Sequence, residues 1–194
     1  MTTLGSIESA ESPHDRNDST RPALRATAEF LGGLLVKEVD GTQLEQLRAP
    51  ALERALTEIG IELPTRANQE AWIEERGAEY HDVFLRPQTG PLVQSLWTQG
   101  RYEGDATVRI RQLAAAAAVE YQKSAARGAA VDHLGSLLLL WSKTDGDAQD
   151  VADEIVRAHL DWAIPGLRRI ESLAGFYGAV ASASLTLIEE LVAT

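Results

Sequence analysis

The sequence predicts an all-α fold in the form of a single-domain multi-helix bundle. Apolar residues recur at spacings of three and four along much of the 194-residue chain, which is the period of one helix face. No stretch alternates apolar and polar residues between hairpin turns, and no repeat of fixed period is found. Glycine and proline interrupt the helical pattern often enough to divide the chain into several helices.

The beginning of the chain differs in composition from the rest. Residues 1–20 are rich in Ser, Thr, Asp and Glu, so we expect a disordered tail there and an all-helical domain over residues 21–194. Ser19 or Thr20 is predicted to cap the first helix, with Pro22 in its first turn. One face of this helix is apolar and should enter the core: Leu24, Ala28, Leu31 and Leu35.

Three further helices are predicted before residue 86. Gly41 and Pro50 bracket a short helical piece. A second piece stops at Gly60, and its apolar residues are Leu52, Leu56 and Ile59. A long amphipathic helix is predicted over residues 67–85, with Asn68 as its cap. These pieces are expected to pack around the central part of the chain.

The next stretch alternates loops and helices. Residues 86–91 contain two prolines and a glycine, which predicts a loop followed by a short apolar segment around Trp97. Asp105 is predicted to cap a helix that continues to Lys123. Near the end of the chain, residues 172–188 are uncharged but shorter than the roughly 20 residues that a bilayer crossing needs. We therefore expect a buried helix there.

The centre of the chain is a predicted pair of antiparallel helices within residues 131–162. Asp132 precedes an apolar run at a position where a carboxylate stabilises a helix start. After a turn at Asp145-Gly146, Asp147 is available to cap the second helix. A short connection returns the second helix beside the first, so His159 should come close to Asp132 and its neighbour His133. The sequence thus predicts a polar cluster at one end of this pair.

Composition limits the partners and the compartment. The 29 acidic and 18 basic residues give a formal charge of -11, which disfavours nucleic acid and anionic lipid and favours basic partners such as a cationic peptide. The chain has no cysteine, which excludes disulfides and thiolate metal sites. No basic start followed by an apolar stretch marks a signal peptide. We expect a cytoplasmic protein without stable membrane insertion.

Five short motifs occur in the order and rough spacing found in one family. They are Tyr80-His-Asp-Val-Phe84-Leu-Arg-Pro87, Ser95-Leu-Trp97, Asp132-His133-Leu134, His159-Leu-Asp-Trp162 and Phe176-Tyr177. Through them the chain resembles the TorD-like chaperones, which include the DmsD and NarJ types, over residues 21–191. The resemblance implies assistance in the cytoplasmic maturation of a molybdenum-containing oxidoreductase, through binding of the enzyme precursor and its leader peptide. For many members of the family that leader is a twin-arginine signal.

The chain departs from the family pattern beside its most specific motif. Val131 stands where the family usually has proline, and Gly135, Ser136 and Leu137 follow where a glutamate is usual. This departure indicates either a different client enzyme or a member that binds its client mainly through apolar contacts.

We expect a peptide-binding site beside the central helix pair. Its candidate residues are Asp132, His133, Trp97, Tyr80, His159, Asp161 and Trp162. Asp132 and Asp161 would accept charge-assisted hydrogen bonds from peptide arginines, while a cleft beside the helices would hold the apolar part of the leader. On this hypothesis the protein is not an enzyme, uses no catalytic residue, cofactor or metal, and is a monomer or homodimer.

Alternative interpretations of the same residues remain open. Asp132 is also explained as a helix cap, and the two histidines as a structural pair, as peptide contacts or as metal ligands. The aromatic residues Trp97, Trp162 and Tyr80 fit the core better than a groove. A metal-dependent hydrolase built on Asp132, His133, His159 and Asp161 is the rival from another class, and an unrelated helical adaptor is a third interpretation.

Overall fold

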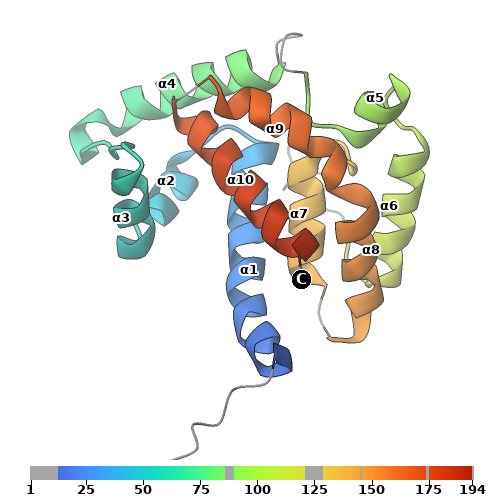
Figure 1. The fold of residues 1–194 in the computed structure, drawn as a ribbon. Helices are drawn as coiled ribbons and strands as arrows, with labels where there is room; N and C mark the ends of the chain where they lie inside the picture. The colour runs from blue at the N-terminus through green and yellow to red at the C-terminus, as the bar shows by residue number, and fades with distance from the viewer. Residues whose placement is uncertain (1–12, 86–89, 121–128, 145, 174, 194) are drawn as a thin grey trace, which may run out of the picture.

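A computed structural model describes residues 13–85, 90–120, 129–144, 146–173 and 175–193, and these form one compact all-α domain (Figure 1). Within these ranges the only β-type pairing is a single bridge between Val93 and His133. The α-helices are α1 (Pro13–Val36), α2 (Gly41–Leu47), α3 (Pro50–Glu58), α4 (Gln69–Tyr80), α5 (Gln94–Gln99), α6 (Asp105–Ala116), α7 (Leu134–Lys143), α8 (Gln149–His159), α9 (Ile164–Glu171) and α10 (Gly175–Ala193). The predicted fold class is therefore confirmed.

Helices α1 and α7 form the centre of the domain and lie side by side (Figure 1). Glycines allow their close approach: a Cβ atom on Gly32 would lie 2.8 Å from the carbonyl oxygen of Gly135, and one on Gly135 would lie 2.6 Å from Val36 Cγ1. Leu134, Leu137, Leu138, Leu140 and Trp141 of α7 are then buried around this contact. Helix α7 is buried because a second helix backbone lies directly against it.

Helix α10 crosses in front of α1 and packs along α9 (Figure 1). By length and composition alone it is the one helix of the described residues that could cross a membrane, but 56% of its most apolar window is buried inside the domain. Phe176 and Tyr177 at its start are fully enclosed, and their rings meet edge to face with centroids 5.1 Å apart. The expectation of a buried helix in this part of the chain is confirmed.

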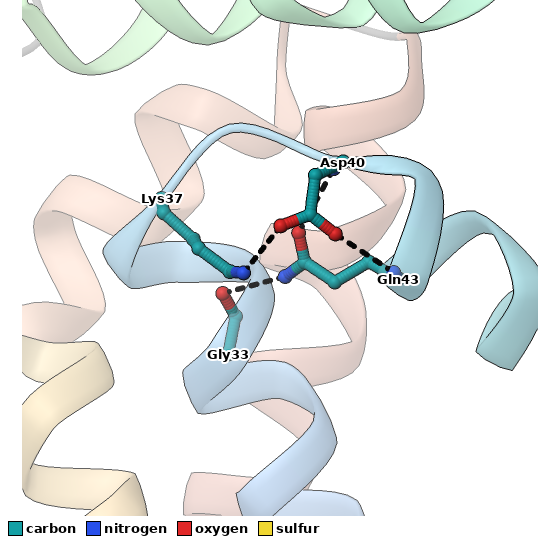
Figure 2. A network of polar contacts seen from close by, with 4 residues as sticks. All are labelled: Gly33, Lys37, Asp40 and Gln43. Carbon is teal, nitrogen blue, oxygen red and sulfur yellow. Dashed lines mark hydrogen bonds and ion pairs between the residues drawn. The ribbon is translucent and has the colours of Figure 1, made fainter. Parts of the chain in front are cut away.

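A polar network fixes the turn between α1 and α2 (Figure 2). Asp40 caps α2 by accepting a hydrogen bond from the Gln43 backbone at 3.0 Å, and the Gln43 side chain accepts one from the Asp40 backbone at 3.2 Å. The Gln43 amide also donates to the Gly33 carbonyl of α1 at 2.9 Å, and Lys37 lies 2.6 Å from the Asp40 carboxylate. This reciprocal cap sets the direction in which α2 and then α3 leave α1.

Several predicted helix ends were wrong. Helix α1 begins at Pro13 and contains Pro22 within it, so residues 13–20 of the predicted tail are helical and the predicted cap at Ser19 or Thr20 is absent. Residues 1–12 lie outside the described residues. Helix α6 ends at Ala116 rather than Lys123, since Ala118 adopts a left-handed backbone with φ of 52°. Residues 121–128 lie outside the described residues.

Three of the predicted caps are also corrected. Asn68 precedes α4 but its side chain makes no capping hydrogen bond, because a 3₁₀ turn, η1 (Arg66–Asn68), leads into the helix. Asp105 is the first residue of α6, and Gly104 occupies the cap position. Asp147 lies inside a 3₁₀ turn, η3 (Gly146–Ala148), so that Ala148 becomes the cap of α8. The long helix predicted over residues 67–85 continues past α4 as a π-helical turn, η2 (His81–Leu85).

Candidate functional site

Asp132 caps a helix from a distant part of the chain. The segment around it runs beside the residues that precede α5, and Leu134 N donates to the Leu92 carbonyl at 2.8 Å. Gln94 N donates to the Asp132 carbonyl at 3.0 Å, and Ser95 N donates to Asp132 Oδ2 at 2.9 Å. Asp132 thus satisfies two N–H groups in the first turn of α5, whereas the sequence predicts that it caps α7. That role belongs to His133, whose Nδ1 accepts from Gly135 N at 3.1 Å.

A buried chain of hydroxyl groups extends from Asp132 into α6. Ser95 Oγ donates to Asp132 Oδ2 at 2.5 Å and lies 3.2 Å from Thr107 Oγ1. Because the Ser95 hydrogen goes to Asp132, the Thr107 hydroxyl is the donor in the second contact. The Asp132 and Ser95 side chains are fully buried, and Thr107 is nearly so. Three short segments, the start of α7 and parts of α5 and α6, are tied together here.

The same helix α5 reaches His159 at the end of α8. Gln94 Oε1 lies 2.9 Å from His159 Nδ1, and the Gln94 amide donates to the Ala158 carbonyl at 3.3 Å. Since a carbonyl oxygen only accepts, Nδ1 of His159 carries the hydrogen. The sequence predicts that Asp132 and His159 lie near each other, and the structure links them through Ser95 and Gln94. Helix α5 lies between them, and the sequence pattern does not predict this position of α5.

Burial disfavours the charged form of both histidines. It lowers the pKa of His133 to about 4, against the attraction of the adjacent Asp132, and it also lowers the pKa of His159, although Glu154 acts in the opposite direction. His133 is occupied with the backbone of its own helix, so the two rings serve separate contacts. These are the contacts of structural histidines.

The three candidate aromatic residues lie in two separate places. Trp97 and Trp162 are each half buried, with indole N–H groups donating to the carbonyls of Pro91 and His159 at 2.9 and 2.8 Å. Helix α5, which carries Trp97, contacts the 3₁₀ turn η4 (Asp161–Ala163), which carries Trp162. Tyr80 lies elsewhere in the core, where its hydroxyl donates to the Leu35 carbonyl at 3.0 Å. The structure therefore separates Tyr80 from the other candidates.

Asp161 borders a cleft of about 490 Å³ between α1, α7, α8 and α10. Its lining combines apolar and charged side chains: Arg21, Leu24, Trp141, Asp153, Val156, Arg157, Asp161, Leu191 and Val192. Arg21 lies 4.0 Å from Asp153, a long and partly exposed ion pair, whereas Asp161 makes no ion pair with any described residue. The sequence predicts a cleft beside the two central helices, but it gives no sign of the contribution of α1, α10 and Asp153.

The structure offers little for metal chemistry. Among the described residues no group of three or more histidine, cysteine, aspartate or glutamate side chains could hold a metal ion. Asp132 and both histidines are committed to the hydrogen bonds described above. The metal-dependent hydrolase is therefore not supported by any cluster in this part of the chain.

Comparisons with known proteins give one clear result. No family model matches the chain, and no curated protein matches it. A solved structure described as a "Putative Redox Enzyme Maturation Protein" from Archaeoglobus fulgidus is similar, with a TM-score of 0.55 and 19% sequence identity. The likeness covers 95% of this chain and 99% of the other. It shows a shared fold over most of the chain, and it is consistent with the resemblance to TorD-like chaperones.

Proposed function

We propose that this protein is a chaperone for the maturation of a redox enzyme and that it acts by binding the enzyme's precursor. The observation that carries the proposal is the likeness in fold to the Archaeoglobus protein over 95% of this chain, since the description of that protein names redox enzyme maturation. The five sequence motifs support the same function independently, because they depend on the order of residues along the chain and not on the likeness in fold. Binding of a precursor requires no covalent chemistry, and the proposed role is therefore not that of an enzyme.

The finer identity of the client follows from the resemblance to TorD-like chaperones. We infer that the client is a molybdenum-containing oxidoreductase, that its leader peptide is part of what is bound, and that binding takes place in the cytoplasm before export or assembly. A twin-arginine leader combines basic residues with an apolar stretch. A peptide of that kind suits a chain with a formal charge of -11.

The cleft beside α7 and α8 is the proposed binding site. It combines an apolar floor, which includes Trp141, with the carboxylates of Asp153 and Asp161. A guanidinium group from the peptide would form paired hydrogen bonds with these carboxylates and would displace Arg21 from its long contact with Asp153. Affinity would come mainly from burial of apolar side chains, while the arginine contacts would fix the register of the peptide.

The buried hydrogen bonds of Asp132, Ser95 and Gln94 support this site from the interior of the domain. They hold α5 against the start of α7 and the end of α8, and so position Trp97 next to the turn that carries Trp162 and Asp161. Asp132 Oδ1 accepts no hydrogen bond from the described residues, but it is buried. A direct contact between Asp132 and a peptide arginine, as the sequence predicts, would require α5 to move. That contact stays a prediction, as do those of His133, His159 and Tyr80.

Calorimetric titration tests the proposal. The full chain is titrated with leader peptides of redox enzymes encoded in the same genome, at two salt concentrations. We expect binding that weakens with salt and that falls by about tenfold or more in the double variant Asp153→Asn/Asp161→Asn. Asp150→Asn is the matched control, since Asp150 is exposed on α8 and does not line the cleft. Absence of binding to every leader would remove the leader-binding function.

A further inference from the structure

Helix α3 is amphipathic, yet it buries none of its residues. Its apolar side chains, Leu52, Ala55, Leu56 and Ile59 just after its end, follow the spacing of one helix face. Leu52 and Leu56 are only half buried, and Ile59 is 59% exposed. A face of this kind normally packs against a neighbouring element, because burial of apolar surface is the main source of tertiary stability for a helix. Here the face remains largely open.

The apolar face of α3 forms one wall of a groove of about 540 Å³. Phe30 of α1 and the start of α10 form the other walls, and α3 stands at the edge of the domain away from α5 and α6 (Figure 1). Small residues widen the groove, since Ala26, Ala179 and Ala183 line it where larger side chains would fill it. Its volume falls in the range of about 300 to 1,000 Å³ that ligand sites occupy.

The groove is preformed rather than a gap beside a loose helix. The polar network of Asp40 and Gln43 (Figure 2) fixes α2, and α3 follows α2 directly along the chain. After α3 the chain turns back through Gly60, whose φ is 80°, and Ile61 N donates to the Leu56 carbonyl at 2.8 Å. Arg48 donates to the Pro64 carbonyl at 3.0 Å and so joins the two ends of the α3 segment. Both ends of the wall are thus anchored.

The charges beside the groove indicate the chemistry of its occupant. In a projection down the axis of α3, with 100° between successive residues, Glu53 and Glu58 lie about 110° to either side of the centre of the apolar face. Arg54 lies on the opposite face. Both glutamates are exposed, and neither pairs with a described residue. A second copy of this chain would bring its own charge of -11 to the contact. A cationic partner is the complementary one.

We propose that this groove docks an amphipathic α-helix of a partner protein, with apolar residues at positions i, i+3, i+4 and i+7 and with lysine or arginine on both flanks. Such a helix would complete the unpartnered face of α3, while its basic residues would meet Glu53 and Glu58. The site is separate from the Asp161 cleft, because it lies between α1, α3 and α10. The inference goes beyond the proposed function and does not require a leader peptide.

The test uses a fluorescent synthetic helix about 18 residues long, with a leucine stripe and lysine flanks. A second peptide keeps the stripe and has glutamate in place of each lysine. Binding to the full chain is followed by fluorescence anisotropy. Ala55→Trp and Ala183→Trp fill the groove from opposite walls, and both positions are exposed. Ala51→Trp is the matched control, because Ala51 is exposed on the same helix but does not line the groove.

We expect the cationic peptide to bind and the acidic peptide to bind at least about tenfold more weakly. Each groove-filling variant should weaken binding of the cationic peptide by a similar factor. Ala51→Trp should leave its affinity within about twofold. The proposal is wrong if the cationic peptide fails to bind at about 1 mM, if both peptides bind equally, or if Ala51→Trp weakens binding as much as Ala55→Trp does. Circular dichroism confirms that each variant is folded.

Discussion

The carboxylate of Asp132 caps a helix that lies 37 residues earlier in the chain: its Oδ2 accepts hydrogen bonds from the backbone N–H of Ser95 at 2.9 Å and from the Ser95 hydroxyl at 2.5 Å. A six-residue helix such as α5 has little stability of its own, because most of its backbone groups lack partners within the helix. Asp132 supplies those partners from the start of α7. The Asp-His pair is therefore a structural junction between α5 and α7.

Removal of this cap should destabilise the protein. Asp132→Ala leaves the Ser95 N–H and hydroxyl buried without their acceptor, and we expect a loss of about 2 to 4 kcal/mol in the free energy of unfolding. Asp132→Asn keeps an oxygen acceptor and should cost less, about 1 kcal/mol. Urea denaturation monitored by circular dichroism measures both. Equal stability of the alanine variant and the unmodified protein would contradict the capping role.

A double-mutant cycle separates the cap from general damage to the core. Ser95→Ala removes the hydroxyl and leaves the backbone N–H bond to Asp132 in place. Because the two side chains interact directly, the losses from Ser95→Ala and Asp132→Ala should not add, with a coupling of about 0.5 to 3 kcal/mol. Additive losses would show that the contact contributes nothing measurable.

Stability should fall in mild acid because of His133. Burial lowers its pKa in the folded protein to about 4 from an ordinary value of 6.5. Between these values the unfolded chain binds a proton that the folded chain does not, so the free energy of unfolding decreases as the pH falls from about 6.5 to about 4 and this contribution then levels off. The total from His133 is on the order of 3 kcal/mol. His159, whose pKa is also lowered by burial, adds in the same direction.

The variant His133→Asn isolates this effect. Asparagine is a good helix cap and keeps an acceptor for Gly135 N, but it does not titrate. We expect urea denaturation between pH 4 and 7 to give a shallower dependence of stability on pH for this variant. Parallel profiles for the variant and the unmodified protein would mean that His133 takes up no proton on unfolding.

Alanine substitution should have opposite effects on stability at two adjacent glycines of α1, because only one of them lies against α7. Gly32→Ala would place a Cβ atom 2.8 Å from the Gly135 carbonyl oxygen, so the helices must separate, at a cost of about 1 to 3 kcal/mol. Gly33→Ala meets nothing closer than 3.8 Å and should stabilise the helix by up to about 1 kcal/mol. Thermal unfolding of the two variants measures this difference. Similar melting temperatures would contradict the close packing of these helices.

The order of the helices along the chain was predictable because it depends on local patterns, whereas the central packing of α1 against α7 was not predicted. Apolar spacing identified α1, α3, α4 and α8, a continuous apolar run identified α7, and glycine and proline marked α2 and most of the breaks between helices. Caps were predicted poorly, because a polar residue near a helix start can bond to any backbone that tertiary structure brings close. Asp132 sits just before α7, yet its partner is Ser95, which no local pattern could name.

The candidate site was predictable only in outline. The proximity of Asp132 and His159 follows from a short antiparallel connection, whereas the insertion of Gln94 between them depends on a long-range contact. Gln94 and Ser95 did carry a signal, since both are polar residues within a short apolar segment. The sequence also indicated the groove beside α3, because apolar spacing predicts an amphipathic helix there. The spacing does not show against which element that helix packs. Which of its faces would stay uncovered depends on packing.

The most direct test of the proposed function is a double-mutant cycle across the Asp161 cleft, measured by calorimetry. The peptides are a leader that binds and versions of it in which one arginine at a time is replaced by citrulline, which is similar in shape but uncharged. Each peptide is titrated into the unmodified protein and into Asp161→Asn. If Asp161 holds a peptide arginine, Asp161→Asn weakens the arginine peptide by about tenfold and leaves one citrulline peptide unaffected. The same loss with every peptide would contradict a contact between Asp161 and an arginine of the client.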